Sequence, residues 1–215
     1  MSSKILVLPG DGIGVEVADQ AIRVIEKLNE QGLNASYEKD LVGGASYDVN
    51  GEPLTNSVLE KAKNSDAVLL GAVGGSKWDD VERSKRPEAG LLGLRKELEL
   101  FANLRPALVF DALVSASTLK NEVVNNLDIM IVRELTGGVY FGQPRGIEDT
   151  PNGKKAIDTQ IYHDYEIDRI ARVAFDLARK RNNKVTSVEK ANVMETGVLW
   201  REIVKETHKD FSDIT

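Results

Sequence analysis

The stretch Ile5-Leu6-Val7-Leu8-Pro9-Gly10-Asp11-Gly12-Ile13-Gly14 decides the fold class, because it joins a short apolar run to a glycine turn. Apolar residues then recur at helical spacing, at Val17, Ala21, Val24, Ile25 and Leu28. The order strand, turn, helix is typical of α/β proteins. The turn has the spacing GxGxG, whereas a dinucleotide-binding fingerprint has GxGxxG, so spacing alone favours a structural turn.

The next segments continue the same pattern. We predict strands over Ala35–Lys39 and Ala67–Leu70, and between them a helix over Ser57–Lys63 with Ser57 and Glu60 in capping-box spacing. The strand Ala67–Leu70 shows no polar alternation, which is typical of strands covered on both faces. The sequence therefore predicts a largely parallel sheet with helices on both sides.

The second half of the chain mixes helices with extended segments. We expect helices over Glu88–Leu100, Tyr165–Arg181 and Glu195–His208, an extended segment over Phe101–Phe110 with Pro106 at an edge or strand end, a buried-type strand over Asp128–Arg133, and a further strand over Lys184–Val188. The glycine-rich and proline-containing segment Tyr140–Ile161 is predicted to be a protruding hairpin arm, of the kind that often meets a partner subunit. Pattern alone suggests a division into residues 1–100 and 101–215.

Composition is that of an ordinary globular protein, with 41% hydrophobic and 29% charged residues in 215. The net charge of −6 opposes binding to nucleic acid through a broad basic surface. The apolar run Ile5–Leu8 is too short for a signal sequence or a membrane span, so we expect no membrane association and a cytoplasmic location. Absence of cysteine excludes disulfides, thiolate metal sites and cysteine nucleophiles.

Three arginines, Arg95, Arg105 and Arg133, lie within or beside apolar segments. A guanidinium stays charged when it is buried, so each needs an anionic partner. That partner is structural in one interpretation, supplied by Glu134 or Glu97. In the other, the three arginines bind the carboxylates of a small polyacid, which suits their bidentate geometry. The residues alone leave both interpretations open.

Several other residues could have a role in catalysis or binding, or could be purely structural. Tyr140 and Lys190 are either strand residues or a proton donor and a general base. The loop Ala72-Val73-Gly74-Gly75 follows a predicted strand, where open parallel sheets bind ligands, yet a flexible loop would look the same. We interpret His163 and His208 as surface or packing residues, since neither has neighbours that suggest a metal site or a triad.

Taken together, these motifs resemble one family. They occur in family order and span nearly the whole chain: Leu8–Gly14, Gly71–Gly75, Arg86–Arg95, Phe101–Pro106, Val132–Gly142 and Lys190–Val193. With them the chain strongly resembles the isocitrate/isopropylmalate dehydrogenase family. The resemblance implies an α/β two-domain fold with a largely parallel sheet and a β arm, of which this chain would lack the C-terminal part.

The resemblance also implies roles for individual residues. Arg95, Arg105 and Arg133 would hold the carboxylates of a substituted malate, Lys190 would take the hydroxyl proton, and Tyr140 would protonate the enol left after carbon dioxide departs. Glu88, Leu91 and Leu92 match positions near the substrate side group. Isocitrate enzymes place polar residues there, so the two leucines favour an isopropyl group, which is worth roughly 1–3 kcal/mol of discrimination.

Cofactors follow from the same resemblance. Ile13, Ala72, Val73, Gly74, Gly75 and Asn192 would lie beside NAD, which this family binds without a Rossmann fingerprint. Mg²⁺ or Mn²⁺ would stabilise the enolate oxygen as a Lewis acid. The aspartates that bind this metal would follow Thr215, so we expect no metal ligands within this chain and little turnover by the chain alone.

The function implied is oxidative decarboxylation of (2R,3S)-3-isopropylmalate to 4-methyl-2-oxopentanoate with reduction of NAD, in leucine biosynthesis. The family also implies a homodimer in which Lys190 reaches the substrate of the partner subunit. Three alternatives remain. They are a sister enzyme for isocitrate, tartrate or homoisocitrate, a non-catalytic dimerising fragment, and a general module that binds small anions.

Overall fold

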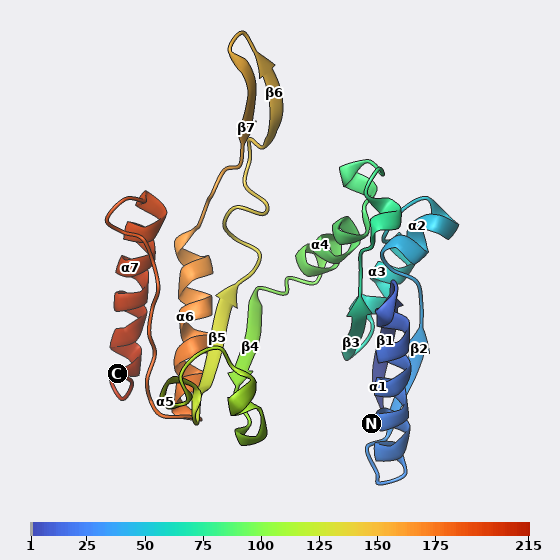
Figure 1. Ribbon diagram of the computed structural model, residues 1–215, viewed down its shortest axis with the longest axis horizontal. Coiled ribbons are helices and arrows are strands. Elements are labelled where there is room, and N and C mark those ends of the chain that lie inside the picture. The colour runs from blue at the N-terminus through green and yellow to red at the C-terminus, as the bar shows by residue number, and fades with distance from the viewer. Residues whose placement is uncertain (1) are drawn as a thin grey trace. The chain divides into compact units, whose positions relative to one another are not determined.

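The computed structural model describes residues 2–215, which form two compact units (Figure 1). One unit extends to Glu99 and the other comprises Leu100–Thr215.

The first unit is built on a three-stranded parallel sheet with the order β2-β1-β3. Its strands are β1 (Ser3–Gly10), β2 (Ala35–Lys39) and β3 (Ala67–Ala72). Ile5 of β1 lies opposite Tyr37 on one side and Ala67 on the other. The predicted parallel sheet is therefore confirmed in this unit, with β1 at its centre.

Helices cover both faces of this sheet. Val7 packs against Ala18 and Ile22 of α1 (Ile13–Asn29). Leu6 and Leu8 face the other way, toward α3 (Asn56–Lys63) and α4 (Pro87–Glu97). Because successive side chains of a strand point to opposite faces, burial of consecutive residues requires cover on both sides.

The residues that α1 buries are not the apolar residues that recur at helical spacing in the sequence. Val17 and Val24 are 52% and 59% exposed, whereas Gly14, Ala18 and Ile22 are buried. Gly14 sets this rotation: a Cβ added to it would lie 2.3 Å from the carbonyl oxygen of Pro9, so the helix starts pressed against the sheet. Residues at four-residue spacing from Gly14 then face the sheet.

Two local features of the first unit were not predicted correctly. The helix α2 (Gly44–Asn50) was not foreseen, since two glycines and a short length hide its periodicity. The helix α3 begins at Asn56 and not at Ser57. Its cap is Thr55, whose hydroxyl oxygen accepts a hydrogen bond from the Val58 amide at 3.3 Å, so the predicted capping box of Ser57 and Glu60 is wrong. Two short 3₁₀ turns, Ser76–Trp78 and Arg83–Lys85, precede α4.

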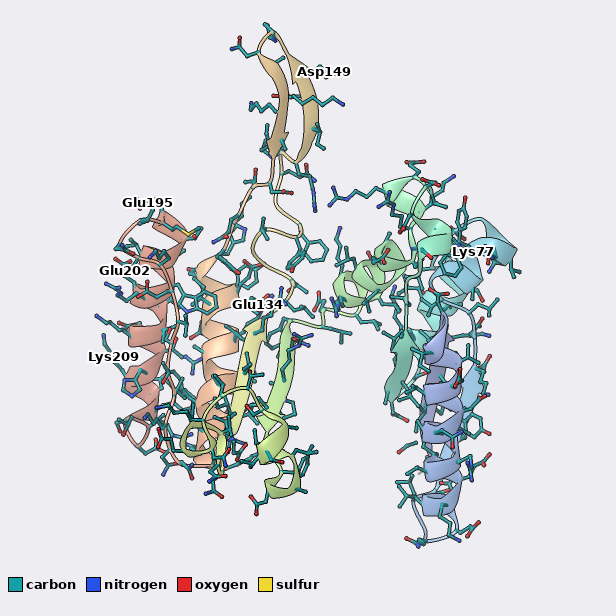
Figure 2. All side chains as sticks on the ribbon, viewed as in Figure 1. Lys77, Glu134, Asp149, Glu195, Glu202 and Lys209 are labelled. Carbon is teal, nitrogen blue, oxygen red and sulfur yellow. The ribbon has the colours of Figure 1, made fainter. Side chains whose placement is uncertain are left out.

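The second unit contains two antiparallel ladders. β4 (Ala102–Leu108) pairs with β5 (Asp128–Glu134), and Pro106 lies opposite Met130 on a strand with a single partner, as predicted. A 3₁₀ turn (Asp111–Ala116) and the short helix α5 (Asn121–Val124) connect the two strands. β6 (Gly146–Thr150) and β7 (Gly153–Ile157) form the predicted hairpin arm, on which Asp149 is labelled in Figure 2.

Two long helices complete this unit, α6 (Asp164–Arg179) and α7 (Glu195–His208), and a 3₁₀ turn (Lys209–Phe211) follows (Figure 1). The predicted helix forms, and it buries one apolar face, made of Ile167, Ile170, Ala171, Phe175 and Ala178. The apolar side chains of α7 are only partly covered, and Val198 is 36% exposed. His208 packs against Phe175, and its Nε2 lies 2.7 Å from the carbonyl oxygen of Ile214, so its interpretation as a packing residue is confirmed.

Two predictions for strands in this unit are wrong. Lys184–Val188 forms no strand; the Val185 amide instead donates to the carbonyl oxygen of Thr215 at 2.9 Å. A cavity of about 520 Å³, lined by both this segment and β5, separates it from the nearest ladder. β5 itself is not buried, because α6 covers only one of its faces and leaves Ile129 and Ile131 about half exposed.

Candidate functional site

In the first unit, Asp11 organises the glycine turn. Asp11 follows β1 and is buried, and its carboxylate accepts hydrogen bonds from the amides of Gly44 at 2.9 Å, Ala45 at 2.7 Å and Gly74 at 2.9 Å. One side chain thus ties the end of β1 to the start of α2 and to the loop after β3. We did not single out Asp11 from the sequence; its position between two glycines was the only signal.

The turn and the loop after β3 are pressed together at the carboxyl edge of the sheet. The Asp11 amide donates to the carbonyl oxygen of Ala72 at 2.6 Å. Gly10 has a φ of +74°, and a Cβ on it would lie 1.9 Å from that oxygen. Ile13, 62% exposed in the first turn of α1, lies just after this turn. The structure therefore brings Ile13 and the loop Ala72–Gly75 to one edge, where parallel sheets bind ligands.

Glu88 borders the same loop. Gly74 has a φ of +110°, and a Cβ on it would lie 2.7 Å from Oε1 of Glu88. Glu88 is in the first turn of α4, the half-buried Leu91 and Leu92 follow one turn later, and Arg95 is in the last turn. The first unit thus groups the loop with Glu88 and presents the two leucines and Arg95 on the same helix.

In the second unit, Arg105 and Arg133 share one face of the β4–β5 ladder. Asn103 lies opposite Arg133, and Arg105 lies opposite Ile131. Residues paired across a ladder point to the same face, as do alternate residues of one strand. Arg105 and Arg133 are therefore diagonal neighbours, on the face that α6 leaves open.

Tyr140 lies next to Arg133, whose guanidinium carbon is 5.2 Å from the centre of the tyrosine ring. This is a cation–π distance, at which the ring face attracts the positive charge. Glu134 is not the partner of Arg133, contrary to the structural interpretation. As the next residue of a strand it points to the opposite face, where its carboxylate binds Arg169 at 2.9 Å.

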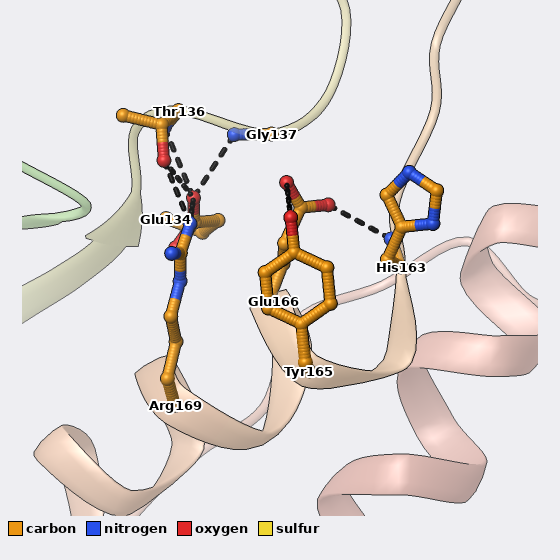
Figure 3. A network of polar contacts seen from close by, with 7 residues as sticks. All are labelled: Glu134, Thr136, Gly137, His163, Tyr165, Glu166 and Arg169. Carbon is orange, nitrogen blue, oxygen red and sulfur yellow. Dashed lines mark hydrogen bonds and ion pairs between the residues drawn. The ribbon is translucent and has the colours of Figure 1, made fainter. Parts of the chain in front are cut away.

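A buried network surrounds Glu134 at the end of β5 (Figure 3). Its Oε1 accepts hydrogen bonds from the Thr136 amide at 3.0 Å, the Thr136 hydroxyl at 2.9 Å and the Gly137 amide at 2.9 Å. Nη2 of Arg169 in α6 donates to the same Oε1 and also to the Thr136 hydroxyl oxygen at 2.7 Å. The Arg169 guanidinium stacks on Phe101, 4.5 Å from the ring centre. Sequence reasoning missed Arg169, because nothing links positions 134 and 169 before the chain folds.

Lys190 and Asn192 lie in an exposed turn before α7. The amides of Val193 and Met194 donate to the carbonyl oxygen of Lys190 at 3.1 and 2.9 Å. Glu189 secures this turn by accepting hydrogen bonds from the Ala191 amide and from Nε of Arg201, and these bonds hold the pKa of its carboxyl below the usual range. The turn belongs to the α7 side of the unit, whereas Arg105 and Arg133 belong to the β4–β5 ladder.

The described residues suit the two expected cofactors, NAD and a divalent cation, to different degrees. The edge formed by Ile13 and Ala72–Gly75 suits a nucleotide at Gly12, which is exposed, has a φ of +51° and has open space where a Cβ would lie. For the divalent cation, no three histidine, aspartate or glutamate side chains within residues 2–215 gather closely enough to hold a metal ion. In the same part of the chain, no helix is long and apolar enough to cross a membrane.

Comparison with known proteins places the chain in a family. The family model for isocitrate/isopropylmalate dehydrogenase matches residues 4–215. A 3-isopropylmalate dehydrogenase from Rhodopseudomonas palustris (strain BisB18) is 62% identical over 214 residues, which are 98% of this chain and 58% of that protein. One from Chromohalobacter salexigens is 57% identical over 215 residues, which are 100% of this chain and 60% of that protein.

Solved structures agree with the sequence relatives. The crystal structure of isocitrate dehydrogenase from Methylococcus capsulatus matches 99% of this chain and 58% of that chain, with a TM-score of 0.75 and 31% identity. The chain thus spans about three fifths of the length of the proteins it resembles. Since the family match covers nearly every residue, the chain belongs to the isocitrate/isopropylmalate dehydrogenase family.

Proposed function

We propose that the chain supplies substrate-handling and cofactor-binding residues for oxidative decarboxylation of (2R,3S)-3-isopropylmalate to 4-methyl-2-oxopentanoate, with reduction of NAD, in cytoplasmic leucine biosynthesis. Relatives 57–62% identical to it are named 3-isopropylmalate dehydrogenase, which supports this choice. They are longer than this chain, so the activity of a whole protein is part of the proposal.

The arrangement of Arg105, Arg133 and Tyr140 is the observation that carries the proposal. Two guanidiniums on one open face suit the two carboxylates of a malate, because each can bind a carboxylate through two parallel hydrogen bonds. Tyr140 places a proton donor beside Arg133. Arg95, at the end of α4, is the third proposed carboxylate ligand.

The proposed chemistry assigns one proton to each of two side chains. Lys190 accepts the proton of the C2 hydroxyl as the C2 hydride leaves; bound NAD would supply the hydride acceptor. The product is a β-keto acid, whose carboxylate on C3 departs as carbon dioxide and leaves the bonding electrons in an enolate. Tyr140 then donates a proton to C3. Each transfer suits its group, since an amine can act as a base and a phenol as an acid.

The two units divide this work in the proposal. Residues 1–100 form the cofactor side, with Ile13 and the loop Ala72–Gly75 as proposed NAD contacts, and Asn192 is a further NAD contact that the family resemblance implies. Residues 101–215 form the substrate and dimer side. Mg²⁺ or Mn²⁺ is the family's metal, but no step is assigned to it because the described residues offer no ligand set.

Leu91 and Leu92, with Glu88, set the substrate preference in this proposal. They are half-buried neighbours on α4 and give an apolar surface for an isopropyl group. The enzymatic alternative is a sister activity on isocitrate, tartrate or homoisocitrate, whose polar side groups would lose hydration against the leucines.

Calorimetric titration of the chain tests the proposal. We expect 3-isopropylmalate to bind more tightly than isocitrate or tartrate, and Arg105→Gln or Arg133→Gln to weaken binding roughly tenfold or more, since a hydrogen bond to a charged group is worth about 1.5–3 kcal/mol. Arg172→Gln is the matched control, because Arg172 pairs with Asp168 and Asp210 on the surface. Tighter binding of isocitrate, or equal binding by all three variants, would contradict the proposal.

Catalysis and assembly need separate measurements. We expect negligible NADH production by the chain alone, because no metal ligand set lies within residues 2–215, and robust turnover would show that this expectation is wrong.

The hairpin arm, with Ile147 largely exposed, supports a homodimer with a shared site. Sedimentation velocity should show a dimer that becomes a monomer when residues 146–157 are replaced by a short glycine linker. A monomeric parent chain would contradict it.

A further inference from the structure

Glu134 and Arg169 form a largely buried ion pair in which two polar atoms lack a hydrogen-bond partner within residues 2–215. The loss of their hydration opposes folding, so a gain in stability does not account for the pair. The Glu134 side chain is 1% exposed and the Arg169 side chain 28%. Oε2 of Glu134 and Nε of Arg169 are buried and have no hydrogen-bond partner among the described residues. An imperfectly satisfied buried ion pair is often no more stable than apolar residues of the same size. A geometric role explains its presence better than a contribution to stability.

All donors to Glu134 come from the segment that leads to Tyr140 or from the helix behind it. Thr136 and Gly137 donate three hydrogen bonds to Oε1, and Arg169 donates the fourth (Figure 3). The Thr136 hydroxyl donates to Glu134 and accepts from Arg169, so it links the two members of the pair. Glu134 and Arg169 together therefore hold the first turn after β5 against α6.

The constraint extends toward Tyr140 through the next residues. Gly138 has a φ of +85°, and its amide donates to the carbonyl oxygen of Ile161 at 2.7 Å. A Cβ on Gly138 would lie 2.5 Å from the Tyr162 hydroxyl, and one on Gly137 would lie 3.0 Å from Oε2 of Glu166. The chain is thus held on both sides up to two residues before Tyr140.

We propose that Glu134 and Arg169 are positioning residues, which fix the turn Thr136–Gly138 and thereby hold Tyr140 over Arg133. Arg133 and Glu134 are consecutive on β5 and point to opposite faces. Arg133 presents its guanidinium on one face of β5. Glu134, on the other face, anchors the turn after which the chain brings Tyr140 back to Arg133. The placement of Tyr140 follows from contacts alone, whereas its value for proton transfer rests on the proposed function.

Fluorine NMR of the chain labelled with 3-fluorotyrosine tests this placement. The chain has five tyrosines, and Tyr140→Phe identifies the Tyr140 resonance. Arg133→Gln should shift that resonance in the parent chain, because it removes the charge above the ring. In the Glu134→Gln or Arg169→Gln background, we expect the same change to shift the Tyr140 resonance severalfold less, because the ring no longer lies over residue 133.

Controls separate positioning from loss of fold. Arg172→Gln removes two surface ion pairs of the same helix, to Asp168 and Asp210, and should leave the Tyr140 response to Arg133→Gln unchanged. Should Glu134→Gln also collapse the Tyr162 and Tyr165 resonances, Thr136→Val gives the deciding measurement, since it keeps the side-chain shape and deletes the bridging hydroxyl. A full Tyr140 response in Glu134→Gln, or in Thr136→Val when Glu134→Gln unfolds, would overturn the proposal.

The measurement needs no substrate, so its outcome is distinct from that of the proposed function. If the Tyr140 response disappears in Glu134→Gln while the parent chain fails to bind 3-isopropylmalate, the positioning role stands and the proposed function falls. If 3-isopropylmalate binds and the response persists, the positioning role falls alone.

Discussion

The strands β1 and β5 have similar sequences and different surroundings. Both contain four consecutive apolar residues, Ile5–Leu8 and Ile129–Val132. Leu6, Val7 and Leu8 are at most 1% exposed, whereas Ile129 and Ile131 are 48% and 50% exposed. β1 has a parallel neighbour on each side and helices on both faces, whereas β5 has one ladder partner and one helix. An apolar run thus predicts a strand, but its neighbours set its burial.

The two strands also end in the same way. Asp11 immediately follows β1, and Glu134 is the last residue of β5. Each is a buried carboxylate that accepts hydrogen bonds from backbone amides outside its strand. Asp11 has three amide donors, all of them on residues more than thirty positions away. Glu134 binds the turn after its own strand and gains Arg169 from α6. A buried acid at a strand end therefore orders the loops around a site in both units.

The largest expected effect comes from the cores of the two strands. We expect Leu6→Ala to lower the free energy of unfolding of the first unit by about 3 kcal/mol, because it leaves a cavity in a closed core. Ile131→Ala should cost the second unit only about 1 kcal/mol, since half of that side chain is already in water. Urea unfolding measures both, with Trp78 reporting the first unit and Trp200 the second.

Single-tryptophan versions of the chain, Trp200→Phe and Trp78→Phe, keep these two signals apart. Equal losses from Leu6→Ala and Ile131→Ala would show that β5 is covered in solution, and the contrast between the strands would be wrong.

A smaller effect is expected at Asp11. Asp11→Ala removes the acceptor of three amides in a buried position and should destabilise the first unit by about 2 kcal/mol. Amide exchange at Gly74 should become much faster, because that amide donates to Asp11. Exchange at Gly137, which donates to Glu134 in the second unit, is the internal control and should not change.

The helix cap on α3 tests the correction to the predicted capping box. Thr55→Ala should lower the stability of the first unit by about 1 kcal/mol, since it deletes the acceptor of the Val58 amide. Ser57→Ala should have almost no effect, because Ser57 lies inside the helix and not at its start. Thermal unfolding followed by Trp78 compares the two variants, and the opposite order would favour the capping box.

The smallest effect is an acid response of the second unit. A hydrogen bond from Arg179 lowers the pKa of Asp213 from 3.8 to about 2. The stabilisation it provides is complete above pH 3.8 and disappears as the pH falls toward 2, because the unfolded chain takes up the proton first. Asp213→Asn should remove this part of the acid sensitivity, and salt should reduce it, since both side chains are about half exposed. A pH series of Trp200 unfolding curves measures the difference.

Much of the fold could be predicted from the sequence because it depends on local patterns. Ala35–Lys39 and Glu195–His208 have the predicted bounds, and the arm forms where glycine and proline interrupt the chain. Lys184–Val188 was predicted as a strand and forms none, because a strand needs a partner and a cavity lies between this segment and β5. The helix α2 was missed because its start depends on Asp11, which accepts the amides of Gly44 and Ala45.

For the site, the sequence by itself determined the residue types and their order: the glycine turn, the loop Ala72–Gly75, the arginines, Tyr140 and Lys190. Spacing along one chain is enough for such patterns. Only the tertiary structure decided that Arg105 and Arg133 share a face, that Tyr140 lies over Arg133, and that Glu134 turns away to Arg169. The register of the ladder and the packing of the helices bring these distant positions together, and neither can be predicted from the spacing of residues along the chain.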